Sequence, residues 1–214
     1  MSFEIEAVLS QNITLVYDSL DLQTVDRNRL RDIASIHTQP MIMDTPEMIV
    51  AVYTTDSVFI QIGDRRIRVT VQQSAQQLGG VPIWDIAAKS SQLAPEAKSR
   101  LIAYGFNYDV GGRMTEVDVM PTLTRIFVPS VQELEDTLQA QLVSVMPRLL
   151  FQRGHTRYDL VIEPVDQRHI KAHFNTHFEW VALALPSPQD LRLSFLHEYE
   201  HWRLTLGRLL ERGK

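Results

Sequence analysis

The chain has 214 residues, of which 44% are hydrophobic and 22% are charged, and it contains no cysteine. This length suffices for a sizeable core, and the lack of cysteine excludes disulfides and cysteine-ligated metals. A net charge of −5 argues against broad nucleic-acid binding, and no apolar run is long enough for a membrane span or secretion signal. We therefore expect a cytoplasmic protein that has no membrane partner.

The first half of the chain alternates between extended and helical patterns. Residues 3–17 alternate apolar and polar side chains and predict one long strand. Thr24 is typical of a helix cap and predicts a short helix that ends before Pro40, with Leu30, Ile33 and Ala34 on one face. Residues 48–72 are rich in β-branched side chains and predict two or three antiparallel strands with a turn at Gly63-Asp64.

Helical composition then returns before the middle of the chain. Residues 82–103 are rich in Ala, Lys and Glu, and Pro82 and Pro95 suit the first turns of one or two short helices. The next segment, 104–110, alternates again and predicts a strand. Gly111-Gly112 offer the backbone freedom of a turn, so we expect the strand to end there.

The second half begins with a helix and a hairpin. Ser130 and Glu133 form a capping box, which predicts a helix up to Pro147. A hairpin follows, with its turn at Asp166-Gln167. The predicted apolar stripe of the helix consists of Val131, Leu134, Leu138, Leu142 and Val145.

The C-terminal segment carries the strongest helix signal. Ser187 is a cap, Pro188 suits the first helical position and Asp190 suits the first turn. The predicted buried stripe is Leu191, Phe195, Tyr199, Trp202, Leu206 and Leu209.

Strand, helix, hairpin and helix thus occur twice in the same order. We predict an α+β fold, a mainly antiparallel sheet with helices packed on it, in a single domain over residues 1–214. The repeated order suggests a duplicated βαββα unit, with halves at 1–98 and 99–214.

One motif carries catalytic chemistry, the H-E-x-x-H of residues 197–201. On a helix, His197 and His201 share one face and can bind zinc, with Glu198 as general base of a hydrolase. Catalytic zinc needs three protein ligands, and the few residues after His201 offer no suitable third one. We therefore keep the zinc hydrolase as an alternative to a solvated helix face.

Two polar clusters are further candidates. The three arginines Arg65, Arg66 and Arg68 beside a hairpin turn suit a phosphate, an acidic partner or a nucleic acid, or form an exposed solubilising edge. One face of the last predicted strand is polar. This face is either exposed to solvent or, if it lies against the final helix, supplies the third zinc ligand. Its residues are His169, Lys171, His173, Asn175 and His177.

Three segments resemble an uncharacterised bacterial family with a SecB-like fold. They are VFIQIGDRRIRVT, YGFNY, and the final helix after HFNTHFEW. The resemblance implies a sheet covered by helices. Members of that fold group are similar to export and toxin–antitoxin chaperones, which hold extended apolar segments.

Without a complete catalytic set, the extended strands and the amphipathic final helix favour a binding role. We expect a non-enzymatic protein-binding, chaperone-like or complex-assembly component that uses no cofactor. Its partner is another protein or a second copy in a homo-oligomer, and nucleic acid is disfavoured.

Overall fold

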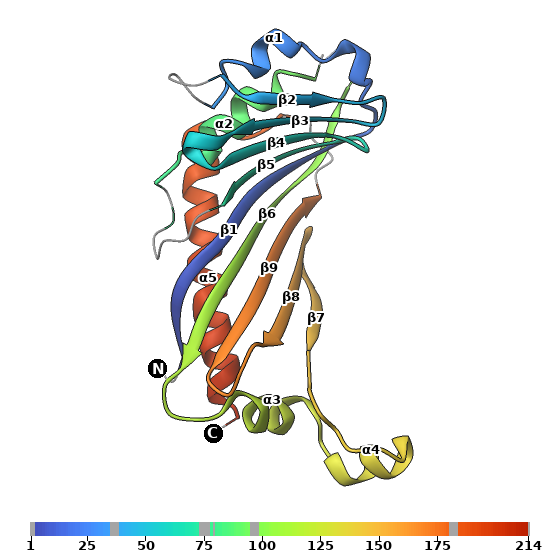
Figure 1. The fold of residues 1–214 in the computed structure, drawn as a ribbon, viewed down its shortest axis with the longest axis vertical. Coiled ribbons are helices and arrows are strands. Elements are labelled where there is room, and N and C mark those ends of the chain that lie inside the picture. The colour runs from blue at the N-terminus through green and yellow to red at the C-terminus, as the bar shows by residue number, and fades with distance from the viewer. Residues whose placement is uncertain are drawn as a thin grey trace.

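A computed structural model describes residues 3–34, 39–72, 78, 80–94, 99–179 and 184–213. The described strands form one sheet of nine, in the order β2-β3-β4-β5-β1-β6-β9-β8-β7 (Figure 1). All neighbouring pairs are antiparallel. The strands are β1 (Phe3–Tyr17), β2 (Met41–Asp44), β3 (Met48–Tyr53), β4 (Val58–Gly63), β5 (Arg66–Gln72), β6 (Leu101–Met114), β7 (Arg148–Arg153), β8 (Thr156–Pro164) and β9 (His169–Glu179).

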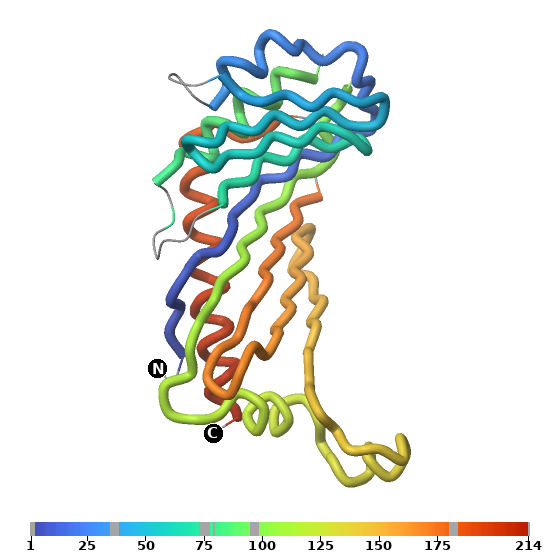
Figure 2. The backbone as a smooth tube through the Cα atoms, in the orientation of Figure 1, coloured from blue at the N-terminus to red at the C-terminus, as the bar shows by residue number. Residues whose placement is uncertain are grey.

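The two longest strands form the centre of the sheet. β1 and β6 run side by side along almost their whole length, from the pair Phe3–Met114 to the pair Tyr17–Leu101 (Figure 2). β5, β4 and β3 continue outward from β1, as β9, β8 and β7 do from β6. The predicted duplication is compatible with this arrangement and stays a prediction.

The helices cover one face of the sheet and its ends. α2 packs on β1 and β5, and α5 packs on α2, β1 and β6 (Figure 1). The opposite face carries half-exposed polar side chains, and we call it the open face. The helices are α1 (Arg27–Leu30), α2 (Ile83–Ser91), α3 (Val119–Phe127), α4 (Val131–Leu138) and α5 (Pro188–Glu211), with short 3-10 turns at Leu22–Thr24 and Thr54–Asp56.

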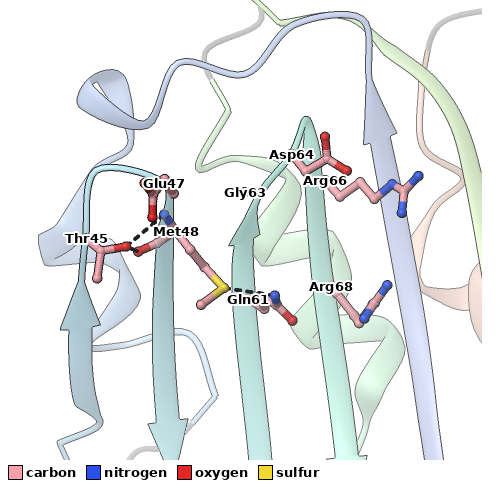
Figure 3. A pocket seen from close by; sticks show the side chains of 8 residues that line it. All are labelled: Thr45, Glu47, Met48, Gln61, Gly63, Asp64, Arg66 and Arg68. Carbon is pink, nitrogen blue, oxygen red and sulfur yellow. Dashed lines mark hydrogen bonds between the residues drawn. The ribbon is translucent and has the colours of Figure 1, made fainter.

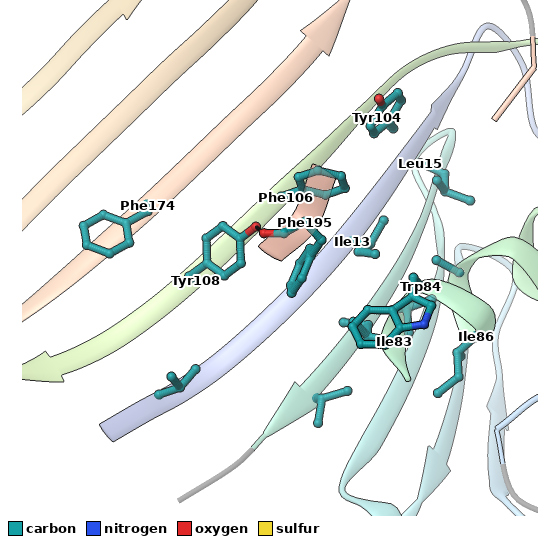
Figure 4. Packing of buried hydrophobic residues seen from close by; sticks show 14 of the residues in the cluster. Ile13, Leu15, Ile83, Trp84, Ile86, Tyr104, Phe106, Tyr108, Phe174 and Phe195 are labelled. Atoms are coloured by element: carbon teal, nitrogen blue, oxygen red, sulfur yellow. Dashed lines mark hydrogen bonds between the residues drawn. The ribbon is translucent and has the colours of Figure 1, made fainter. Parts of the chain in front are cut away.

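Aromatic side chains join α5 to the centre of the sheet. The ring of Phe195 lies 5.2 Å from that of Phe106 and 4.7 Å from that of Tyr108 (Figure 4). The Tyr108 hydroxyl donates to the Phe195 carbonyl over 2.7 Å. Because its phenol is fully buried, this bond also satisfies a polar group that water cannot reach. The core therefore fixes both the position of α5 and its rotation about its axis.

The C-terminal helix, α5, agrees closely with the cap and the buried stripe predicted from the sequence. Ser187 accepts a hydrogen bond from the Asp190 backbone N–H, and Pro188 is the first helical residue. Four of the predicted stripe residues are fully buried: Leu191, Phe195, Trp202 and Leu206. Tyr199 and Leu209 are half-buried, and Leu210 takes the last buried position instead.

The predicted start of the first helix, at Thr24, is wrong. The Thr24 hydroxyl donates to the Asp21 carbonyl and closes a 3-10 turn, so it cannot cap a helix. Asp26 caps α1 instead and accepts from the backbone N–H groups of Asn28 and Arg29. The helix that follows has one turn and ends at Leu30, so the predicted helical positions of Ile33 and Ala34 are also wrong. Residues 35–38 of the predicted helix lie outside the described residues.

The strand end predicted at Gly111-Gly112 is also wrong, because β6 continues through both glycines to Met114. Pairing with β1 on one side and β9 on the other holds this stretch extended. A Cβ at Gly112 would lie 2.3 Å from the Phe3 ring, so glycine serves close packing here rather than a turn.

The helix that begins at Ser130 is shorter than predicted. Its cap is confirmed, because the Ser130 hydroxyl accepts from the Glu133 N–H, but α4 ends at Leu138. Gln139 takes a left-handed conformation at φ 51°, and the rest of the predicted stripe lies outside the helix. None of the α4 residues is buried, so no packing layer extends it.

Between Met48 and Gln72 the structure has three strands, where two or three were predicted, and α2 accounts for one predicted helix. A second helix beginning at Pro95 would start outside the described residues, and its predicted extension to residue 103 is wrong because β6 begins at Leu101. The sequence patterns missed β2, β7 and α3, and Pro121 in the first turn of α3 is tolerated because the N–H groups there have no intrahelical partner.

Candidate functional site

The H-E-x-x-H motif lies in the middle of α5, where its three functional side chains have different surroundings. His197 is exposed, whereas His201 is half-buried and its ring lies 6.1 Å from that of Tyr158. The Glu198 carboxylate accepts a hydrogen bond from the Thr176 hydroxyl over 3.2 Å. Glu198 therefore faces the sheet and not an open site above the helix.

Thr176 links this carboxylate to the core. It is fully buried, and its hydroxyl oxygen accepts from Trp202 Nε1 over 2.8 Å. The negative charge of Glu198 also acts on nearby phenols. Burial, with a smaller contribution from Glu198, raises the pKa of Tyr104 to about 12 and that of Tyr108 well above its usual value. Glu198 thus has a structural role in addition to any chemical one.

The polar face of β9 does not meet the motif. Trp202 stacks on Phe174 with ring centroids 5.1 Å apart, so α5 packs on the apolar face of β9. His173 and His177 project from the other side of the same strand. The alternative in which a β9 histidine completes a zinc site is therefore wrong. Within the described residues, no three His, Asp or Glu side chains are arranged to hold a metal ion.

The open face instead carries rows of hydrogen-bonded side chains across its central strands. In one row, Asp109 accepts from the Ser10 hydroxyl and from His173 Nδ1, the latter over 2.6 Å. In the next row, Asn107 donates to Asn12 over 2.7 Å and accepts from Asn175. These side chains lie opposite one another in register, so the rows follow from strand pairing.

Asp109 is the carboxylate in these rows, and its surroundings lower its pKa. Partial burial by itself raises its pKa, but the hydrogen bonds from His173 and Ser10 and the charge of His173 outweigh burial and lower the pKa. A pocket of about 260 Å³ opens beside this pair, between Leu9, Glu163 and Lys171. Ser10 and His173 each form a hydrogen bond with Asp109 and not with each other, so the described row does not form a nucleophile–base pair.

The three arginines do not act as one group. The loop between β4 and β5 is Asp64-Arg65, one residue later than predicted, and both residues are left-handed, with φ of 48° and 57°. Arg65 contributes its carbonyl, which accepts from the Tyr17 N–H over 2.9 Å. Arg66 and Arg68 project together from the open face of β5, as Figure 3 shows.

A pocket of about 340 Å³ lies beside this pair on the open face. Arg66 and Arg68 line it together with Gln61 of β4, Glu47 and Asp64 (Figure 3). Because two carboxylates face two guanidinium groups, the pocket has no strong net charge. It can bind a polar group, but it favours no single class of ligand.

A group of exposed apolar side chains lies elsewhere, in and after α4. We call residues 131–147 the arm. α4 stands away from the sheet in Figure 1, and the arm exposes Leu138 (57%), Val143 (85%) and Met146 (65%). β7 follows directly and exposes Leu150 (70%) and Phe151 (40%). Sequence reasoning missed this surface because it placed the chain up to Pro147 in one packed helix, with Leu138 in the buried stripe.

The arm has a defined local structure. The Glu135 carboxylate accepts from the Leu142 N–H over 2.8 Å, and the Ala140 N–H donates to the Glu135 carbonyl. Val145 packs against the core. The chain is thus anchored while Val143 and Met146 face outward.

These features define an α+β protein built on one nine-stranded antiparallel sheet, with polar rows on the central strands of its open face and an exposed apolar arm. No protein-family model matches the sequence, and no curated protein matches it. No described helix combines the length and the apolar content that a membrane crossing requires.

Proposed function

We propose that this chain is a non-enzymatic protein-binding component, chaperone-like or part of a complex, that holds extended apolar segments of other polypeptides in the bacterial cytoplasm. The observation that carries the proposal is the arm, whose Leu138, Val143 and Met146 are more than half exposed. Apolar groups gathered on one exposed surface commonly mark a site of protein interaction.

Two further features support this proposal. The resemblance to the SecB-like family points to proteins that bind extended segments without turnover. The H-E-x-x-H glutamate is already hydrogen-bonded to Thr176, which reduces its freedom to act as a base. Both favour binding over hydrolysis.

The test is the binding of a permanently unfolded polypeptide, reduced and carboxymethylated, followed by fluorescence anisotropy. We expect wild type to bind it and the variant Val143→Glu/Met146→Glu to bind at least tenfold more weakly, because charge placed on the arm opposes apolar contact. The matched control is Leu193→Glu on α5, where a single leucine is 61% exposed outside the arm.

The control variant should bind as wild type does. The proposal fails if wild type does not bind the unfolded polypeptide, or if the arm variant binds it as tightly as the control does.

A further inference from the structure

The two edges of the sheet differ in how they are protected. β2 has four residues, lies between Pro40 and Pro46, and its Asp44 pairs with Arg27 over 2.9 Å. A short strand with flanking prolines and a charge resists pairing with another strand. β7, at the other edge, has six residues without proline or lysine and exposes Leu150 by 70%. Pro147 precedes β7 and Arg148 and Arg153 stand at its ends, but β7 is longer than β2 and no proline follows it, so it offers more free backbone than β2.

The register identifies which backbone groups of β7 are free. The Ile162 N–H donates to the Pro147 carbonyl over 3.0 Å, so these opposed residues form a hydrogen-bonded pair. Such pairs alternate with non-hydrogen-bonded ones along an antiparallel ladder. It follows that Leu149, Phe151 and Arg153 direct their backbone groups to β8. The groups of Arg148, Leu150 and Gln152 point outward, where no described strand lies.

We propose that the β7 edge binds the β7 edge of a second copy of this chain, antiparallel about a two-fold axis at Leu150. This register pairs all three outward-facing residues with outward-facing residues. Leu150 meets the partner's Leu150 on the open face, and Arg148 meets the partner's Gln152. A register shifted to an axis at Leu149 or Phe151 leaves one outward residue of each copy unpaired.

The side chains of β7 suit this self-pairing. Leu149 and the partner's Phe151 lie on the helix-covered face, so apolar groups meet on both faces of the joint. The charge of Arg148 is already compensated by Asp159 of β8, at 2.7 Å. The pairing therefore brings no like charges into opposition, and the two sheets become one continuous sheet.

The paired backbone lies in β7 and not in α4, and of the arm only its last residue, Pro147, lies opposite a β7 residue of the partner, so this inference does not depend on the proposed function. The first measurement is the mass of the tag-free protein by sedimentation velocity over a wide concentration range. We expect a species of twice the 24.6 kDa chain mass. The variant Leu150→Lys should be a monomer or dissociate at least tenfold more readily, whereas Leu193→Lys should match wild type.

Cysteine cross-linking tests the register, because the natural chain has no cysteine. Opposed Cα atoms in a hydrogen-bonded pair are about 5.5 Å apart, within the range of a disulfide. Leu150→Cys should therefore form a disulfide-linked dimer under mild oxidation, and Gln152→Cys and Leu193→Cys should not. This test does not require the lysine variant to fold.

A wild type that stays monomeric overturns the inference, as does a dimer in which Leu150→Cys cross-links no better than Leu193→Cys. A monomer that still binds the unfolded polypeptide through the arm leaves the proposed function standing. A dimer that cross-links through Leu150→Cys but does not bind that polypeptide would support this inference and refute the proposed function.

Discussion

The Thr176 hydroxyl of β9 lies between Trp202 and Glu198 of α5, accepting from the indole N–H and donating to the carboxylate. The contact is buried, and it joins the last strand of the chain to its last helix. Through it, the glutamate of the H-E-x-x-H motif becomes part of the fold.

Removal of this hydroxyl should destabilise the protein. Thr176→Val keeps the side-chain volume but leaves the buried Trp202 N–H without a partner, which costs about 1–3 kcal/mol. We expect the free energy of unfolding in urea to fall by that amount. Thr14→Val, on the open face of β1, is the control and should have a much smaller effect. Equal losses in both variants would refute a special role for Thr176.

The structure also predicts the metal content. His197 is exposed, Glu198 faces the sheet, and the described residues offer no third ligand. Protein purified without chelators should therefore carry far less than one zinc ion per chain by elemental mass spectrometry. His197→Ala/His201→Ala should not change that content. Near-stoichiometric zinc that disappears in the double variant would establish the metal site and favour the hydrolase.

The Asp109–His173 pair predicts a pH dependence of stability. The folded-state pKa of Asp109 is lowered, so its carboxylate contributes stability above the unfolded pKa of about 3.9. This contribution is lost as the pH falls through the folded pKa. Urea unfolding from pH 7 into the acid range should show a shallower fall in stability for Asp109→Asn than for wild type.

Asp136→Asn, on the exposed surface of α4, removes the same charge without the histidine contact and serves as the control. Its pH profile should run parallel to that of wild type. If the Asp109 and Asp136 variants gave the same profile, the hydrogen bonds to Asp109 would not be the cause.

The turn between β4 and β5 predicts a stabilising substitution. Arg65 is left-handed at φ 57°, a conformation that costs a non-glycine residue about 1–2 kcal/mol. Arg65→Gly relieves this cost and gives the turn a residue suited to it, so we expect a gain of about 0.5–1 kcal/mol in the free energy of unfolding. Arg66→Gly, in the extended strand, should lose stability instead. A loss in both variants would contradict the turn geometry.

Local patterns in the sequence were sufficient for the elements whose stability is local. The alternation over residues 3–17 gave β1, and Ser187 with Pro188 gave the start of α5. These signals depend on side-chain periodicity and end-capping within a few residues of one another. The α+β class follows from them.

Tertiary pairing decided what lies far apart in the chain. Asp109 meets Ser10 and His173 only because β1, β6 and β9 are neighbours in one register. In the same way, the face of β9 on which α5 packs separates His173 from His197, and the strand order leaves β7 at an edge. The sequence by itself determined the side-chain periodicity of the elements that it predicted, and therefore whether each is a helix or a strand. Only the long-range hydrogen-bonded ladder determined which faces meet, because strand partners are not encoded by local spacing.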